Sequence, residues 1–158
     1  MSVRLSDLRA GIVTALQAVN GSAPYTSDLS GSDQVKQGLY ATPPRAGLPC
    51  VMLAEWSVNS EFGPQLGRWT RTTTWTIVGW APANGDDPAT RWAAVETLAN
   101  DIEIALETAT RVGALKAYAY DCIVREVNEV ETGGEATGYA TFAMTMDFPA
   151  RVNKLGGM

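Results

Sequence analysis

The stretch that decides the fold is DPATRWAAVETLANDIEIALETA, residues 87–109. Asp87 is a favourable N-cap residue, and Pro88 suits the first helical position because its missing N–H is not needed there. The spacing predicts an amphipathic helix over 88–109, about 33 Å long at 1.5 Å per residue. The apolar side chains that recur at steps of three and four, on one helix face, are Trp92, Val95, Ala99, Ile102, Leu106 and Ala109.

Segments that favour β-structure lie on both sides of this helix. Alternating or threonine-rich runs at 50–58, 68–81, 117–127 and 139–148 predict four strands, and apolar spacing over 5–19 predicts a second helix. The order helix, strand, strand, helix, strand, strand predicts an α+β domain. We expect a mostly antiparallel four-stranded sheet with both helices packed on one face. In the first strand, alternation predicts one shared face for Cys50, Met52, Ala54, Trp56 and Val58.

The chain is large enough for one core but too short for two ordinary domains. It has 158 residues, of which 46% are hydrophobic. We predict a single domain over 1–150, with a long loop over 20–49 and a flexible tail over 151–158. The loop contains four residues each of Gly, Ser and Pro. A loop of this length is either plain surface or a segment ordered by a partner.

The composition excludes several kinds of chemistry. The chain has no histidine, which rules out Ser-His-Asp and Cys-His catalysis, HExxH zinc sites and histidine pH switches. The net charge of −5 argues against nucleic-acid recognition, which uses a basic surface. Cys50 and Cys122 are too few for a disulfide framework, and we expect buried free thiols. With no signal-peptide core and no membrane span in the sequence, we expect folding in a cytoplasm.

The candidate sites in the sequence all have structural explanations. The acidic pairs at 86–87 and at 103 and 107 fit a helix cap and a solvated helix face better than acid–base catalysis or a magnesium site. The run Arg68-Trp69-Thr70-Arg71 resembles a single-strand nucleic-acid platform only weakly on an acidic protein. We therefore predict no catalytic, cofactor-binding or metal-binding residues and no enzymatic activity.

Five tryptophans are unusual in a chain of this size. We predict that Trp56, Trp75 and Trp92 fill the core and that Trp69 and Trp80, near strand ends, lie at the surface. Exposed aromatic side chains rimmed by arginine and threonine are typical of protein–protein contacts. The tryptophans therefore favour assembly over catalysis.

The order of elements is similar to that of a known family. A helix over 5–19 is followed by Gly47-Leu48-Pro49 leading into the strand 50–58, then by the long strand 68–81. The helix over 88–109, with the run LANDIEIAL at 98–106, and a final strand pair complete the pattern. This layout resembles the tail terminator (tail completion) proteins of long-tailed bacteriophages and phage-like particles. The resemblance covers most of the chain and is one of element order.

The resemblance implies a structural protein of the virion, assembled in the host cytoplasm. Such a protein forms a ring, usually of six copies, at the head-proximal end of the tail tube, where it ends tube polymerisation and offers a docking face to the head connector. The implied partners are further copies of the chain, the tail tube protein and a connector or stopper protein, with no membrane. DNA passes through the lumen, and six copies with a charge of −5 each would carry −30.

On this interpretation the contact residues follow as hypotheses. We expect subunit or tube contacts from a group in the long loop and the strand hairpin: Tyr40, Pro43, Pro44, Arg45, Gln65, Arg68, Trp69 and Arg71. We expect an acidic lumen face from Glu96, Glu103 and Glu107, which would keep DNA from adhering.

Three alternatives stay open on the sequence alone. The nearest is another head–tail joining or tail-tube component of the same particle. A monomeric α+β domain that binds a small molecule would need a concave apolar pocket. An enzyme is disfavoured by the missing histidine and by the lack of any nucleophile motif.

Overall fold

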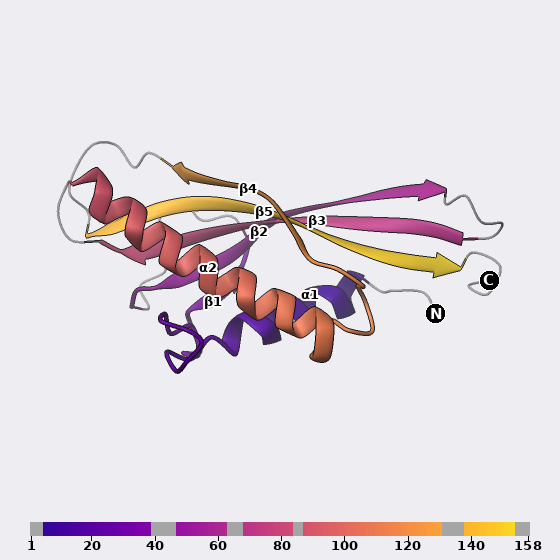
Figure 1. The fold of residues 1–158 in the computed structure, drawn as a ribbon, viewed down its shortest axis with the longest axis horizontal. Coiled ribbons are helices and arrows are strands. Elements are labelled where there is room, and N and C mark those ends of the chain that lie inside the picture. The colour runs from indigo at the N-terminus through magenta and orange to yellow at the C-terminus, as the bar shows by residue number, and fades with distance from the viewer. Residues whose placement is uncertain (1–4, 39–46, 63–67, 84–86, 131–137, 154–158) are drawn as a thin grey trace.

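The computed structural model describes residues 5–38, 47–62, 68–83, 87–130 and 138–153, and it confirms an α+β fold with two helices (Figure 1). The strand order across the sheet is β1-β2-β3-β5-β4. The elements are α1 (Leu5–Gln17), β1 (Val35–Gln37), β2 (Cys50–Phe62), β3 (Arg68–Pro82), α2 (Pro88–Val112), β4 (Ile123–Val130) and β5 (Tyr139–Asn153).

The sheet has five strands and is mixed, with one parallel and three antiparallel pairings, so the predicted number of four strands is one too few while the sheet is mostly antiparallel as predicted. The additional strand, β1, lies inside the predicted loop over 20–49 and pairs parallel with β2, with Val35 opposite Val51. A three-residue strand carries too little alternation to be recognised in a sequence. The same stretch also buries Leu29, whose N–H donates to the Val19 carbonyl at 2.7 Å.

A β-bulge in β2 separates the residues that alternation placed on one face. The pairing with β3 shifts register between Leu53 and Glu55, and an extra residue of this kind moves every later side chain to the opposite face. Met52 lies opposite Val78, and Trp56 lies opposite Trp75. Because Val78 and Trp75 are an odd number of residues apart on β3, Met52 and Trp56 lie on opposite faces of the sheet. The predicted common face is wrong because Ala54 is the residue inserted at the bulge.

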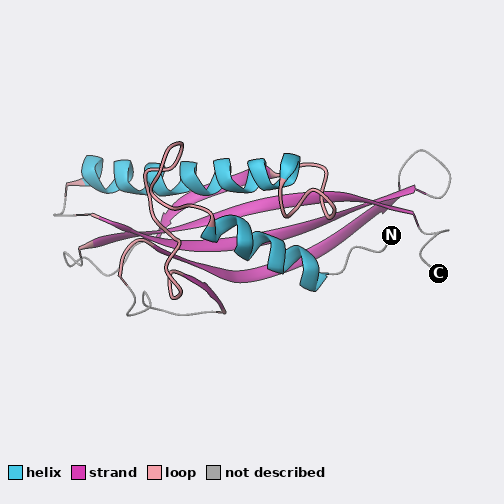
Figure 2. Ribbon diagram, turned by 90° about the horizontal axis from the view of Figure 1, so that it is seen from below, coloured by secondary structure: helices cyan, strands magenta, loops and turns pink. Residues whose placement is uncertain are grey.

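Both helices contribute to one core on a single face of the sheet, which we call the helix face (Figure 2). Gly79 lies on this face opposite Phe142, and a Cβ at position 79 would come within 2.4 Å of the Phe142 ring. The glycine is therefore needed for the ring to pack across β3. Fully buried members of this core include Leu8, Ile12 and Leu16 of α1, Leu98, Ile102 and Leu106 of α2, and Ile77, Phe142, Met144 and Phe148 of the sheet.

The opposite face of the sheet is different in character. At one end, Cys50, Met52 and Trp80 form a second, small buried cluster. Along the rest of this face the central strands present threonines, and we call it the threonine face; its members are Thr70, Thr72, Thr74, Thr76, Thr141 and Thr145.

The helix predicted over 88–109 is confirmed as α2 and is three residues longer at its C-terminal end. The Asp87 carboxylate accepts a hydrogen bond from the Thr90 N–H at 3.3 Å, as expected of an N-cap. The predicted strand over 117–127 begins only at Ile123, because the chain before it turns, with the Tyr118 N–H donating to the Leu115 carbonyl at 2.9 Å. The alternation of aromatic residues there reflects a turn over the buried Leu115.

The last strand is longer than the sequence indicates. β5 pairs with β3 from Tyr139 opposite Pro82 through to Asn153 opposite Arg68. The predicted tail over 151–158 is therefore strand in its first three residues, and 154–158 lie outside the described residues. Neither described helix combines the length and the apolar character required to cross a bilayer.

Candidate interaction surfaces

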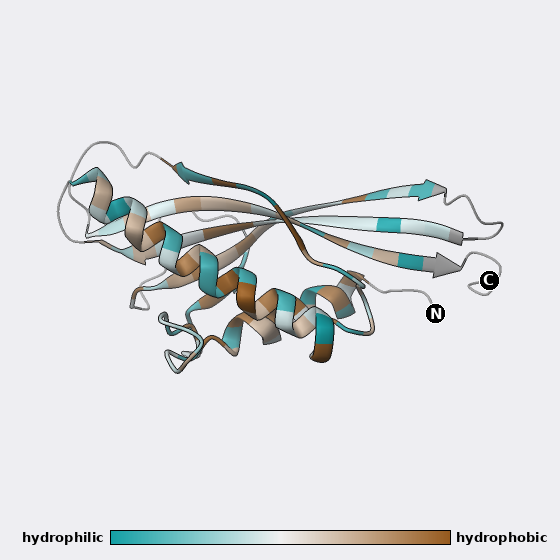
Figure 3. Cartoon of the chain, in the orientation of Figure 1, coloured by the Kyte–Doolittle hydropathy of each residue, from teal (hydrophilic) through white to brown (hydrophobic). Residues whose placement is uncertain are grey.

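Three strands continue beyond the helices and form a projecting arm (Figures 1 and 2). We define the arm as residues 56–62 of β2, 68–75 of β3 and 146–153 of β5, which are paired side by side. In Figure 3 the arm is pale or teal along much of its length, whereas the helices alternate brown and teal. The base of the arm still contributes Trp75, Met146 and Phe148 to the main core, and the far end of the arm extends past the helices.

A buried carboxylate fixes the base of the arm. Asp147 is only 6% exposed and lies on the threonine face. It accepts a hydrogen bond from the Thr74 hydroxyl at 2.7 Å and one from Arg125 Nε at 2.5 Å. Arg125 sits at a second β-bulge, where the register of β4 against β5 shifts between Val124 and Glu126. Strands β3, β4 and β5 are thus tied together where the arm begins.

The helix face of the arm carries exposed apolar side chains. Trp56 is 54% exposed and Val58 is 39% exposed, and both lie on this face because of the bulge at Ala54. The ring of Trp56 rests 6.2 Å from that of the buried Trp75, centroid to centroid. Among the described side chains on this face of the arm, Arg71 alone carries a charge. The surface is apolar with one cation.

The tryptophan assignments made from the sequence are partly wrong. Trp75 is buried as predicted, but Trp80, expected at the surface, is 2% exposed and packs with Cys50 and Met52. Trp56, expected in the core, lies on the arm, and Trp92, also expected there, is 56% exposed on the first turns of α2. A tryptophan is buried here when its position in the sheet is covered by other elements. The sequence of a strand does not show how far along the sheet the helices extend.

The predicted contact residues fall into two groups. Arg68, Trp69 and Arg71 begin β3 and so lie on the arm, with Trp69 and Arg71 partly exposed. Trp69 and Arg71 share the helix face with Trp56, since their partners on β2 are Phe62 and Ser60. The remaining predicted contacts lie outside the described residues: Tyr40, Pro43, Pro44, Arg45 and Gln65.

A groove of about 370 Å³ runs between α2 and β4. It lies on the helix face, near the edge of the sheet that is formed by β4 and away from β2. Its floor is formed by apolar side chains that are nearly or fully buried, and its rim is exposed and acidic. Val127, on β4, is 40% exposed there. The lining residues are Val95, Glu96, Ala99, Asn100, Glu103, Val127 and Met144.

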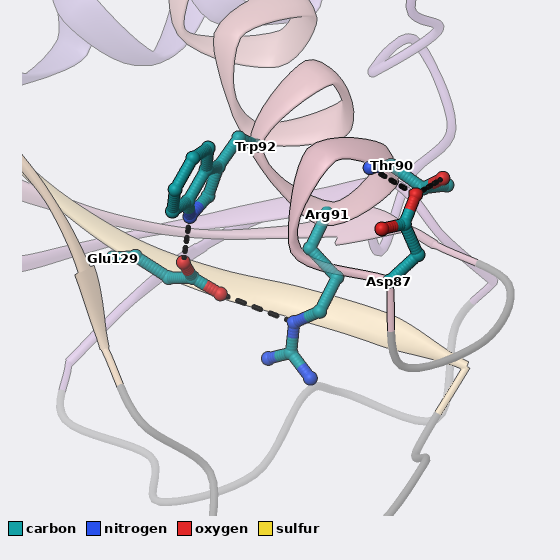
Figure 4. A network of polar contacts seen from close by, with 5 residues as sticks. All are labelled: Asp87, Thr90, Arg91, Trp92 and Glu129. Carbon is teal, nitrogen blue, oxygen red and sulfur yellow. Dashed lines mark hydrogen bonds and ion pairs between the residues drawn. The ribbon is translucent and has the colours of Figure 1, made fainter.

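A polar network joins α2 to β4 one turn before the groove (Figure 4). The Glu129 carboxylate accepts hydrogen bonds from Arg91 Nε at 3.1 Å and from Trp92 Nε1 at 2.9 Å. Asp87 caps the same helical turn through Thr90. The exposed Trp92 therefore positions the strand against the helix.

The three glutamates of α2, which are exposed or partly exposed, lie on or near the same flank. Glu96 and Glu103 line the groove and form no ion pair within the described part of the chain, while Glu107 pairs with Arg111. Burial, together with the negative charges of Asp121, Glu103 and Glu107, raises the pKa of the nearby Cys122 thiol to about 12. The flank is an acidic surface, and whether it lines a lumen stays a prediction.

A second hollow lies beside the N-terminal half of α2, on the opposite flank of the helix from the groove. It encloses about 480 Å³ between the segment 26–28, the ends of β2 and β3, and the helix. Asp101, which is buried, holds this segment by accepting hydrogen bonds from the N–H groups of Thr26 and Ser27 at 3.1 and 2.6 Å. The hollow is lined by Thr26, Ser27, Asp28, Pro49, Ala81, Pro82, Ala93, Ala94, Thr97 and Leu98.

Reactive groups are scarce in the described ranges. No group of three or more Cys, Asp or Glu side chains there is arranged to hold a metal ion. Both cysteines are free, Cys50 buried and Cys122 partly so. Burial raises the pKa of Cys50 to about 11, so both thiols are protonated near neutral pH and are poor nucleophiles.

Comparison with known proteins finds no family model and no curated protein that matches this sequence. The features of the molecule that bear on function are therefore its fold, the arm and the groove between α2 and β4.

The sequence pointed to part of these surfaces. Arg71 on the arm and Glu96 and Glu103 in the groove were found by residue type alone, from an arginine beside a tryptophan and from the acidic face of a helix. Val58 and Val127 were missed, because an exposed valine in a strand has the same alternation as a buried one. Only the extent of the helical layer distinguishes the two cases.

Proposed function

We propose that this chain is a structural subunit that forms a ring of six copies at the head-proximal end of a phage tail tube. In this role it ends tube polymerisation and provides the docking face for the head connector. The partners are copies of itself, the tail tube protein and a connector or stopper protein, and DNA passes through the lumen. The proposal joins the resemblance in element order to the surfaces of the molecule.

The observation that carries the proposal is the arm. Trp56 and Val58 are exposed on strands that reach beyond the helices. Burying apolar surface is worth about 25 cal/mol per Å². The exposed apolar side chains on the β2 side of the arm are thus best explained as part of a contact surface that an assembly covers.

Two distinct surfaces favour a ring over a symmetric dimer. The arm is apolar with a cation, and the α2–β4 flank is acidic, so the two do not resemble each other. A contact between unlike surfaces is heterologous, and it closes into a ring when the rotation per subunit is an integer fraction of a turn. The overall charge supports passage of DNA, because a ring of six acidic chains repels a polyanion.

The test combines native mass spectrometry with negative-stain imaging of the purified chain, alone and added to polymerising tail tubes. We expect closed rings of a single stoichiometry that sit at one end of each tube and stop its growth. Open filaments would instead identify a tube subunit, and rings that leave tube growth unchanged would identify a head–tail joining component. A chain that stays monomeric at high concentration and binds a small molecule in the 480 Å³ hollow would overturn the proposal.

A further inference from the structure

We infer that the arm of one subunit docks, by its helix face, into the groove between α2 and β4 of a second copy of the chain. The inference deepens the proposed function and rests on it, because it names the contact that joins neighbouring subunits in the ring. The groove is assigned a second copy of the chain as its occupant because the arm and the groove complement each other in apolar character and in charge.

The apolar parts match first. The groove has a floor of Val95, Ala99 and Met144, all less than 10% exposed, and Val127 on its rim is partly exposed. The arm offers Trp56 and Val58, which share one face of β2. A hollow of about 370 Å³ gives room for apolar side chains of this kind, and their burial would remove both exposed apolar surfaces from water.

The charges match as well. Arg71 forms no ion pair within the described ranges and is the one charged side chain described on the helix face of the arm. On the other surface, Glu96 and Glu103 likewise have no described cationic partner. Opposite charges that are left without partners in a monomer steer and orient a contact between monomers.

The contact has to be intermolecular and head-to-tail. Trp56 and Val58 of the arm belong to β2, and the groove belongs to α2 and β4, with β3 and β5 between β2 and β4 in the sheet. A rigid sheet of this order holds the two surfaces of one subunit apart. Each subunit therefore presents its arm to one neighbour and its groove to the other, which is the pattern a closed ring requires. Glu96 and Glu103 then line a subunit interface instead of the lumen predicted for them.

A charge exchange tests the contact. Arg71→Glu and Glu103→Arg, each studied alone, should weaken self-association by about tenfold or more, because each places like charges in contact. An equimolar mixture of the two variants should assemble, since every contact in an alternating ring then joins opposite charges. Sedimentation velocity and native mass spectrometry measure both effects, and circular dichroism checks that each variant is folded.

Matched controls keep the result specific. Arg9→Glu makes the same charge change at an exposed position of α1, and Glu61→Arg does so at an exposed position on the opposite face of the arm. Both should assemble as the original chain does. If both single variants assemble normally while the original chain forms rings, the docking inference is overturned and the ring stands. If the mixture alone restores rings but those rings do not arrest tubes, the docking stands and the tail-terminator role falls.

Discussion

The same three strands behave differently in the two halves of the molecule. Under the helices, β3 and β5 bury Ile77, Phe142 and Met144 completely. In the arm, β3 turns to threonines on one face, and the neighbouring β2 exposes Trp56 and Val58 on the other. The ladder of backbone pairing between β3 and β5 is unbroken between the halves, whereas the ladder between β2 and β3 shifts register at Ala54. The difference teaches that pairing extends a sheet while side-chain burial decides which part of it stabilises the fold.

This contrast predicts that the helix-covered half carries most of the free energy of folding and that the exposed β2 side of the arm is free to serve contacts. Substitutions in the two halves should then separate stability from assembly.

The largest effect is expected from Phe142→Ala. The Phe142 ring is fully buried against Gly79, and its removal leaves a cavity in the main core. We expect the free energy of unfolding to fall by about 3–5 kcal/mol, measured by urea denaturation. A decrease of less than about 1 kcal/mol in the free energy of unfolding would mean that the helix-covered half does not supply most of the stability.

Asp147→Ala tests the junction between the halves. It removes the acceptor for both Thr74 and Arg125 at the base of the arm. We expect a loss of about 1–3 kcal/mol in unfolding free energy, with amide exchange accelerated mainly in 68–75 and 146–153. Uniform acceleration across the chain would show that the arm is not a separate unit.

Alkaline pH should weaken the packed clusters that hold the two thiols. Folding raises the pKa of Cys50 from 9.0 to about 11 and that of Cys122 from 9.0 to about 12. The folded chain then holds protons that the unfolded chain releases, so stability is complete below pH 9 and declines as the pH rises through 11 and 12. Urea denaturation at pH 8 and pH 10.5 measures the decline, and a Cys50→Ala, Cys122→Ala double variant should show a smaller one.

The smallest effect on stability is expected from Val58→Thr. The side chain is partly exposed on the arm, and threonine keeps the preference for a strand. We expect the free energy of unfolding to change by no more than about 0.5 kcal/mol, while self-association weakens. Thr72→Val, on the opposite face of the arm, is the control; if both variants associate equally well, the two faces of the arm are equivalent.

Elements with a long hydrophobic pattern could be predicted from the sequence, and elements with a short pattern could not. The helix α2 was found because its apolar stripe, from Trp92 to Ala109, spans about five turns and because Asp87 marks the start of the helix. The strand β1 was missed because three residues hold no period. The bulge at Ala54 was missed because no residue there signals an insertion, and it reversed the face assigned to Trp56.

The candidate surfaces were harder to predict for a different reason. Arg71 and Glu103 have residue types that suggest contacts, but the groove exists only because β4 lies beside α2. That neighbour relation is set by the sheet order, in which β5 inserts between β3 and β4. Periodicity along the chain contains no information on this insertion.

The continuous ladder between β3 and β5 has a mechanical consequence. It runs for 15 residues on each strand, from beneath the helices to the end of the arm, which is about 50 Å at 3.3 Å per residue. A pull along the strands loads the interstrand hydrogen bonds together in shear, whereas a pull across them would open the bonds one at a time. The subunit is therefore stiff along the arm and compliant across it, so tension applied through the arm reaches the core without unzipping the sheet.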